Sequence, residues 1–274
     1  MLKTEERNVA TMHIDRASSA EMLALIQKEN RRAVDVIDAE LGHITLAVDG
    51  IVARMRRGGR LFYVGCGTSG RLGVLDASEC PPTFGVSHDL VVGIIAGGDG
   101  ALRRAVEGAE DSDTDGARDL SAYSLTELDS VVGISVAGGA SYVLGALRYA
   151  KEMGAFCVAL SCNKGCPIEE IADVGIHPDT GAEVIAGSTR MKAGSAHKMI
   201  LNMISTSVMI QLGHVYENLM INLRPTNRKL RARMIRIVSD ICGVTEARAE
   251  VLLEENGFEI RRAVEAEEKA RNVT

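Results

Sequence analysis

The chain has 274 residues, of which 46% are hydrophobic and 25% charged, a composition that supports a full core and excludes disorder. Its formal net charge is -6 and it has no Trp, so it offers neither a positive field nor many stacking platforms for nucleic acid. No apolar run reaches the roughly 20 residues of a membrane span, and residues 1–8 lack the apolar core of a signal peptide. We expect a cytoplasmic protein with no nucleic-acid or membrane partner.

Two helices are predicted at the start of the chain. Ser18 and Glu21 have the spacing of a capping box, which opens a short helix. A second, long helix follows, because apolar residues recur mostly at spacings of three and four from Val34 to Met55, until a Gly-Gly pair ends it. We expect residues 1–58 to form a helical segment that packs on the core.

After residue 58 the apolar pattern changes its period. Short apolar runs alternate with helix-like segments, which is typical of an α/β fold with a parallel sheet and helices on both faces. The predicted strands are Leu61–Val64, Leu90–Ala96, Val131–Val136 and Ala155–Ser161. A long core helix is predicted over Lys192–Leu212. Residues 59–223 are expected to form the main domain, and the more charged residues 224–274 a small helical appendage.

The strongest functional signal is the glycine-rich loop after the first predicted strand. Gly65, Gly67 and Gly70 surround Thr68 and Ser69 where a helix begins, so backbone N–H groups and the positive end of that helix meet where an anion could bind. The glycines also match a dinucleotide fingerprint, but the next strand lacks the acidic residue that this fingerprint needs. The two hydroxyls favour a phosphomonoester. The alternative is that the glycines only permit a tight turn.

Two acidic residues follow this loop at positions that suit catalysis. Glu79 precedes Pro81 and Pro82, which are expected to end the helix, and helical rise puts its carboxylate roughly 12 to 15 Å from the loop. Glu110 lies on a helix predicted over residues 101–111. Two carboxylates that face one ligand could divide general acid and base chemistry between them, although a solvated surface is the usual place for a glutamate.

Two further loops could join the first at the same edge of the sheet, since the carboxyl ends of parallel strands lie together. The loop after the third predicted strand supplies Ser135, Gly138, Gly139 and Ser141. Ser188 and Thr189 precede the long helix, where capping alone would also explain them. His197 and Lys198, within that helix, are expected to be solvated or to cap a neighbour rather than to act in catalysis.

The six cysteines are scattered through apolar stretches, which is typical of reduced thiols. Cys162 and Cys166 form the one close pair, but no second Cys or His pair stands near them, so we expect no metal site. Cys66 lies in the first glycine-rich loop, where a small buried filler is favoured over a reactive thiolate.

Several stretches resemble the bacterial N-acetylmuramic acid 6-phosphate etherases, a family built on the sugar isomerase (SIS) domain. The main ones are Gly65–Gly85 (GCGTSGRLGVLDASECPPTFG), Ala105–Asp111 (AVEGAED) and Gly181–Gly194 (GAEVIAGSTRMKAG). Residues 4–8 and 14–15 are similar to the family as well. The resemblance covers most of the chain, and the first stretch is long enough to be specific.

The resemblance implies a SIS-type fold and an enzyme of cell-wall amino-sugar recycling. Such an enzyme cleaves the D-lactyl ether of N-acetylmuramic acid 6-phosphate, by elimination and hydration, to N-acetylglucosamine 6-phosphate and D-lactate. Glu79 then holds the family's proton-donor position, and Glu110 holds that of the second acid/base, which removes the C2 proton. Ser69 and its loop hold the phosphate, and the enzyme is a homodimer. A carboxylate base suffices for a proton that a neighbouring carbonyl acidifies, so no cofactor is expected.

One loop departs from the family pattern. The family usually shows Ser-Gly-Arg-Thr-Pro before a tyrosine, whereas this chain has Ala-Gly-Gly-Ala-Ser at 137–141 before Tyr142. Three side-chain donors are lost, and each hydrogen bond to a charged group contributes about 1.5 to 3 kcal/mol, so we expect weaker phosphate binding. The change keeps open a noncatalytic sugar-phosphate regulator similar to glucokinase regulatory protein. An aldose–ketose isomerase is a weaker alternative, because it would not explain the match around Glu79.

Overall fold

The computed structural model describes residues 2–223, 225 and 227–272, and the chain divides into two compact units. The first unit holds the chain up to Ser78 together with Asp89–Val208. The second holds Glu79–His88 together with the chain from Met209 onward. The predicted division into residues 1–58, 59–223 and 224–274 stays a prediction.

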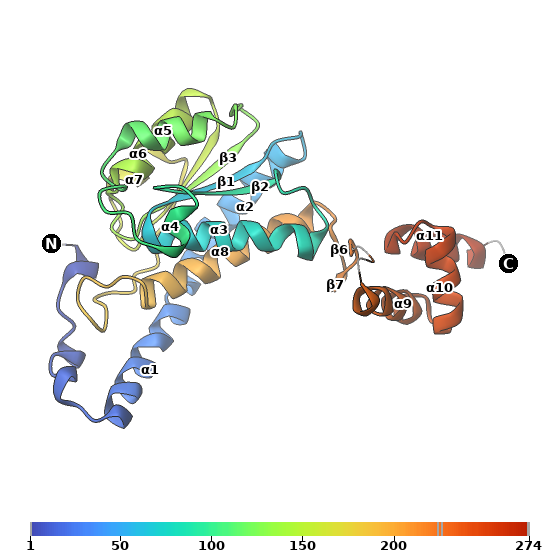
Figure 1. Ribbon diagram of the computed structural model, residues 1–274, viewed down its shortest axis with the longest axis horizontal. Helices are drawn as coiled ribbons and strands as arrows, with labels where there is room; N and C mark the ends of the chain where they lie inside the picture. Colours follow the sequence, from blue (N-terminus) through green and yellow to red (C-terminus); the bar gives the residue numbers. More distant parts are fainter. Residues whose placement is uncertain (1, 224, 226, 273–274) are drawn as a thin grey trace. The chain divides into compact units, whose positions relative to one another are not determined.

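A five-stranded parallel sheet forms the centre of the first unit (Figure 1), with the strand order β2-β1-β3-β4-β5. Its strands are β1 (Leu61–Gly65), β2 (Val91–Ile95), β3 (Ser130–Ile134), β4 (Phe156–Leu160) and β5 (Val174–Ile176). β1, β3 and β4 are buried along their whole length, as apolar runs covered on both faces must be. Gly65 pairs in register with Ile95 and with Ile134, so β1, β2 and β3 end together at one edge. The predicted parallel sheet is confirmed.

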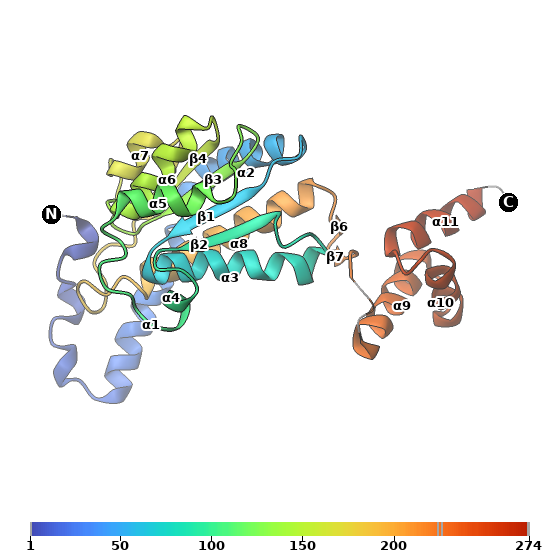
Figure 2. The ribbon, with the colours of Figure 1, turned by 45° about the horizontal axis from the view of Figure 1, so that its top comes forward.

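Helices cover both faces of this sheet, with α5, α6 and α7 on one face and α2, α3 and α8 on the other (Figure 1, Figure 2). Glycines allow the close approach: a Cβ on Gly133 of β3 would lie 2.7 Å from Leu147 of α6, and one on Gly73 of α3 would lie 2.8 Å from Tyr63 of β1. The helices are α2 (Leu41–Met55), α3 (Gly67–Phe84), α4 (Gly100–Arg103), α5 (Asp113–Ser121), α6 (Ser141–Glu152), α7 (Pro167–Ile171) and α8 (Lys192–Gln211). The helix predicted over Lys192–Leu212 is confirmed as α8.

The chain enters the first unit through the short 3-10 helices η1 (Lys3–Glu5), η2 (Val9–Thr11) and η3 (Ile14–Arg16), followed by α1 (Ser19–Asp35). The capping box is present, because the Ser18 side chain accepts from the Glu21 N–H and the Glu21 carboxylate accepts from the Ser18 N–H. The single long helix predicted from Val34 is wrong: α1 ends at Asp35, and η4 (Asp38–Glu40) separates it from α2. The buried Glu40 carboxylate accepts the backbone N–H of His177, which fixes the chain at this break.

Two other helix boundaries differ from the prediction. α3 continues through Pro81 and Pro82, although each lacks the N–H that would donate to a carbonyl one turn earlier, and the Gly85 N–H still donates to the Pro81 carbonyl at 2.9 Å. Gly85, in the left-handed region with φ 68°, ends the helix. The helix predicted over residues 101–111 is cut to α4, because Arg104 is extended, with φ -136° and ψ 137°, which an α-helix excludes.

The second unit is mainly helical, as the sequence indicates. It contains a short hairpin, β6 (Val215–Tyr216) and β7 (Leu219–Met220), and the helices α9 (Arg228–Cys242), α10 (Glu246–Glu255) and α11 (Ile260–Asn272). Met234, Val238 and Leu253 are fully buried in its own core. α9 begins where the Asn227 side chain accepts the Leu230 N–H and ends at Gly243, whose φ is 60°. Among the described residues, none of the helices combines the length and apolar character that a membrane crossing requires.

Candidate active site

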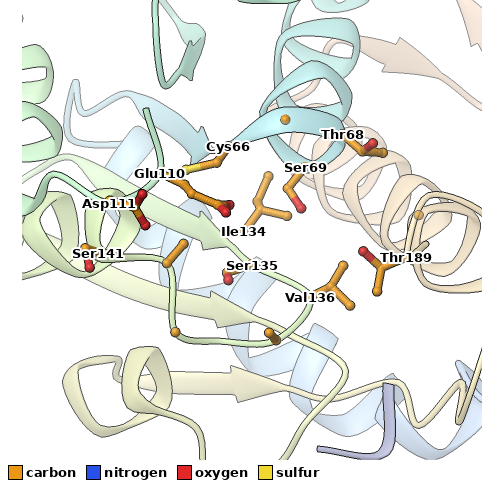
Figure 3. Close-up of a pocket in the computed structure, with 15 residues that line it drawn as sticks. Cys66, Thr68, Ser69, Glu110, Asp111, Ile134, Ser135, Val136, Ser141 and Thr189 are labelled. Atoms are coloured by element: carbon orange, nitrogen blue, oxygen red, sulfur yellow. The ribbon is translucent and has the colours of Figure 1, made fainter. Parts of the chain in front are cut away.

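A cavity of about 480 Å³ opens at the edge of the sheet where β1 and β3 end (Figure 3). This volume is in the range of small-molecule sites. Within the part of the chain that the structure describes, its lining consists of Cys66, Gly67, Thr68, Ser69, Glu110, Asp111, Ile134, Ser135, Val136, Ala137, Gly139, Ala140, Ser141, Thr189 and Gly194. Four stretches that are far apart in the sequence therefore meet around one space.

The first stretch is the loop between β1 and α3. Gly67 has φ 51°, and a Cβ on Gly70 would lie 2.5 Å from the Gly65 carbonyl oxygen, so this turn excludes side chains at Gly70. The backbone N–H groups in the first turn of α3 have no carbonyl partner within the helix and carry its positive end. Thr68 and Ser69 line the cavity beside them. This arrangement is able to bind a phosphate group.

The second stretch runs from the end of β3 into α6. The Ser135 hydroxyl accepts the Gly138 N–H at 3.1 Å, and Gly138 has φ 78°. Gly138 is absent from the described lining because it turns toward Cys166: a Cβ there would lie 2.3 Å from the Cys166 sulfur. Gly139 and Ser141 line the cavity. The start of α6 thus supplies a second set of helix N-terminal donors.

The third stretch precedes α8. Thr189 lines the cavity and its carbonyl accepts the Gly194 N–H at 3.0 Å, whereas Ser188 is not among the described lining residues. Lys192 behind it is almost fully buried, pairs with Glu29 of α1 and donates to the Ala182 carbonyl at 2.6 Å. Burial alone would raise the pKa of Glu29, but its hydrogen bonds and the charge of Lys192 lower it. The ion pair therefore fixes the stretch that carries Thr189.

Sequence reasoning missed this pairing. Lys192 stands at a predicted helix start, where a solvated charge is the ordinary expectation, and its partner Glu29 lies 163 positions away. Glu183, also fully buried, accepts the N–H groups of Lys192 and Ala193. A carboxylate at the N-terminus of a long helix is the signal that could have indicated this arrangement.

Glu110 brings a carboxylate to the cavity. Figure 3 shows its side chain pointing into the space, toward the side where Ser69 lies. Its carbonyl oxygen accepts the N–H of Tyr142, at the start of α6, at 3.0 Å. Asp111 adds a second carboxylate beside it. A proton acceptor and a set of anion-binding donors thus face the same space.

Cys66 stands next to these two acids. Burial raises the pKa of its thiol to about 12, and the negative charges of Glu110 and Asp111 contribute to the rise. The thiol stays protonated near neutral pH and is a poor nucleophile. This agrees with the expectation that Cys66 fills space.

Glu79 lies further along α3, and its side chain is exposed. It is not among the described residues that line the cavity. Its expected role as a proton donor stays a prediction. Across the described residues, no group of three or more His, Cys, Asp and Glu side chains is arranged to hold a metal ion.

The parallel sheet and the cavity at its carboxyl edge define a doubly wound α/β protein with a ligand site at that edge. A family model described as the glucokinase regulatory protein N-terminal SIS domain matches residues 43–151. A phosphoheptose isomerase from Francisella tularensis has the same fold, with a TM-score of 0.51 and 18% identity over 70% of this chain and 98% of that one. A solved structure of an E. coli protein gives a TM-score of 0.53 and 12% identity over 73% of this chain and 95% of that one.

Full-length relatives are more specific. The N-acetylmuramic acid 6-phosphate etherase of Caldanaerobacter subterraneus is 54% identical over 96% of this chain and 86% of its own length. The N-acetylmuramic acid 6-phosphate etherase of Yersinia pestis is 51% identical over 96% of this chain and 89% of its own length. The chain belongs to the N-acetylmuramic acid 6-phosphate etherase family.

Proposed function

We propose that this chain cleaves the D-lactyl ether of N-acetylmuramic acid 6-phosphate to give N-acetylglucosamine 6-phosphate and D-lactate, in cell-wall amino-sugar recycling. The observation that carries the proposal is the identity of 51–54% to etherases over 96% of the chain. The regulatory alternative is supported only by the match over residues 43–151, the SIS domain that both classes share. The enzyme is therefore the better supported of the two.

The phosphate of the substrate lies at the helix starts. Its donors are the first-turn N–H groups of α3, those of α6 other than the Tyr142 N–H, which donates to Glu110, and the hydroxyls of Thr68, Ser69, Ser141 and Thr189, which line the cavity. Gly67 and Gly139 leave room for the ligand, and Ser135, which also lines the cavity, accepts the Gly138 N–H. Gly138 and Ser188 lie outside the described lining.

The chemistry begins on the open-chain sugar, whose aldehyde acidifies the proton on C2. Glu110 takes this proton, the electron pair forms the C2–C3 double bond, and the C3–oxygen bond breaks. Glu79 gives a proton to the departing lactate oxygen. Water then adds to C3 and a proton returns to C2, so the sugar leaves as N-acetylglucosamine 6-phosphate. The chain's own carboxylates carry every proton in this scheme.

The proposed enzyme is a cytoplasmic homodimer. All six cysteines are free, which fits a reducing compartment. Leu23 and Val34 of α1 and Leu46 of α2 are large apolar side chains that are more than half exposed, as at a subunit interface. Light scattering on the purified protein would measure the mass: twice the chain mass is expected, and a monomer at working concentration would contradict the dimer.

The test of the activity is direct. The purified protein is incubated with N-acetylmuramic acid 6-phosphate, and D-lactate is measured with a D-specific dehydrogenase. Release of D-lactate together with N-acetylglucosamine 6-phosphate is expected. No lactate from a protein whose melting temperature rises on adding the sugar phosphate would support the regulator instead.

A further inference from the structure

Arg71 lies beside the phosphate-binding loop, but its side chain reaches elsewhere. The half-buried guanidinium donates from Nε to the Leu102 carbonyl at 3.1 Å and from Nη2 to the Ala101 carbonyl at 2.7 Å. The carbonyls in the last turn of a helix have no partner within it, so α4 offers them to an outside donor. The planar guanidinium fixes the direction of both hydrogen bonds. Arg71 therefore attaches α4 to the start of α3.

The chain that leaves α4 carries Glu110, and its far end is attached as well. Ala109 packs on the core of the first unit, and the Glu110 carbonyl accepts the Tyr142 N–H at 3.0 Å. Between these ends the residues 103–108 are exposed. Two attachments thus hold the two ends of the segment that carries Glu110: Arg71 of α3 binds the carbonyls of Ala101 and Leu102, and Tyr142 of α6 binds the Glu110 carbonyl.

Both residues belong to the helices whose first turns face the cavity. Any ligand phosphate held by those turns is therefore in a fixed relation to Glu110, provided that both attachments hold. Tyr142 acts through its backbone N–H, which no substitution except proline removes. Arg71 acts through its side chain, so its contribution can be deleted.

We propose that Arg71 is a positioning residue for Glu110, which sets the distance between this carboxylate and the phosphate-binding loops. The inference rests on the proposed function, in which Glu110 removes the C2 proton. A misplacement of a reacting group by about 1 Å can cost a factor of about 100 in rate.

The experiment is a double-mutant cycle on the full chain. Arg71→Met, Glu110→Gln and the double variant are compared by kcat and KM for D-lactate release. The exchange of the C2 hydrogen of N-acetylglucosamine 6-phosphate in D2O gives a second readout of proton removal. Arg71→Lys keeps a single donor group, and Arg103→Met, exposed on the same short helix, is the matched control.

For Arg71→Met we expect kcat and C2 exchange to fall by about 10-fold to 100-fold with KM changed less than about threefold. The kcat of Arg71→Lys should lie between those of Arg71→Met and the wild type, and the kcat of Arg103→Met should equal that of the wild type. In the double variant, Arg71→Met should not lower kcat further than Glu110→Gln does alone. The inference would be overturned if Arg71→Met lowered kcat equally in the wild type and in Glu110→Gln, if it left kcat unchanged, or if it raised KM alone. None of these results would contradict the proposed activity. A wild-type protein that releases no lactate would instead reject the proposed function. If Arg71→Met does not fold, the same comparison is made with Arg71→Lys.

Discussion

Gly138 and Gly139 are neighbours in the loop between β3 and α6, yet they differ in the side chains they tolerate. A Cβ on Gly138 would lie 2.3 Å from the Cys166 sulfur, and its φ of 78° disfavours other residues. At Gly139, a Cβ would meet nothing within 4 Å, and the position lines the cavity. A side chain that donates hydrogen bonds can therefore be introduced at Gly139 but not at Gly138.

Gly139→Arg should strengthen substrate binding, because the resemblance places an arginine at this position in the family. A charge-assisted hydrogen bond to phosphate contributes about 1.5 to 3 kcal/mol, so KM should fall about tenfold or more with kcat little changed. Initial rates over a range of substrate concentrations measure this. Gly138→Ala is the contrasting variant, which should lower the melting temperature. A KM for Gly139→Arg that stays at the wild-type value would contradict the expectation.

Glu110→Gln and Glu79→Gln should each lower kcat by about 10² to 10⁴ while ligand binding is largely kept, because an amide has nearly the same volume but neither takes up nor releases a proton near neutral pH. Steady-state kinetics and calorimetric titration with the product sugar phosphate separate the two effects. Glu107→Gln, exposed on the same segment as Glu110 but outside the cavity lining, should be neutral. Unchanged turnover in both of the first two variants would reject the assignment of the two carboxylates.

The secondary-structure elements show where sequence reasoning succeeds. β1, β2, β3 and β4 are found within two residues of their predicted limits, because a buried parallel strand is a plain apolar run. β5 has three residues and two of them are only half-buried, so it gives no such run.

Helix limits were harder to predict, because long-range contacts and backbone conformation decide them. Arg104 takes an extended conformation that ends α4 inside the predicted helix, and nothing local in the sequence requires this. Only part of the site could be predicted from the sequence. Glycine-rich loops are local signals, whereas the ion pair of Lys192 with Glu29 and the hydrogen bond from Tyr142 to Glu110 join distant parts of the chain.

The amino ends of β1 and β3 are joined by a buried carboxylate. Asp129 accepts from the Arg60 N–H at 2.8 Å, from the Arg60 guanidinium at 2.9 Å and from the Thr126 N–H at 2.9 Å. Burial alone would raise the pKa of Asp129, but these hydrogen bonds outweigh it and lower the pKa. The carboxylate therefore stays charged and holds two turns together.

Asp129→Asn should destabilise the fold by roughly 3 kcal/mol, the lower end for a broken buried ion pair, because Arg60 remains partly exposed. Urea unfolding measures the loss. Turnover of the folded protein should be unchanged, since this contact lies at the opposite end of the strands from the cavity. The control is Asp113→Asn at an exposed carboxylate, which should cost less than about 1 kcal/mol.

At the scale of the whole molecule, one buried histidine couples stability to pH. His197 of α8 is fully buried, with Nε2 3.4 Å from the Cys162 sulfur, so of the two alternatives expected for it, solvated or capping a neighbour, the first was wrong. Burial lowers its pKa to about 4 from the ordinary value of 6.5. Below the ordinary value the unfolded chain takes up a proton that the folded chain refuses, so stability falls as pH falls.

The free energy of unfolding should therefore drop by about 3 kcal/mol as pH falls from the ordinary histidine pKa to about 4, at 1.36 kcal/mol per pKa unit. Urea unfolding at several pH values measures the slope. His197→Gln should remove most of it, while His88→Gln, at an exposed position, should keep it. A variant at His197 with the wild-type slope would assign the pH dependence to other groups.

The order of the strands in the sheet determines when this pocket can exist during synthesis. β1 emerges from the ribosome before either of its neighbours, β2 and β3, and Gly194, the last of the described residues that line the cavity, emerges later still. A nascent chain that stops short of Gly194 has its glycine-rich turn but no complete wall around it. Sugar phosphate can therefore bind a complete pocket only after Gly194 has emerged, and the earlier pairing of β1 with β2 and β3 takes place without that ligand.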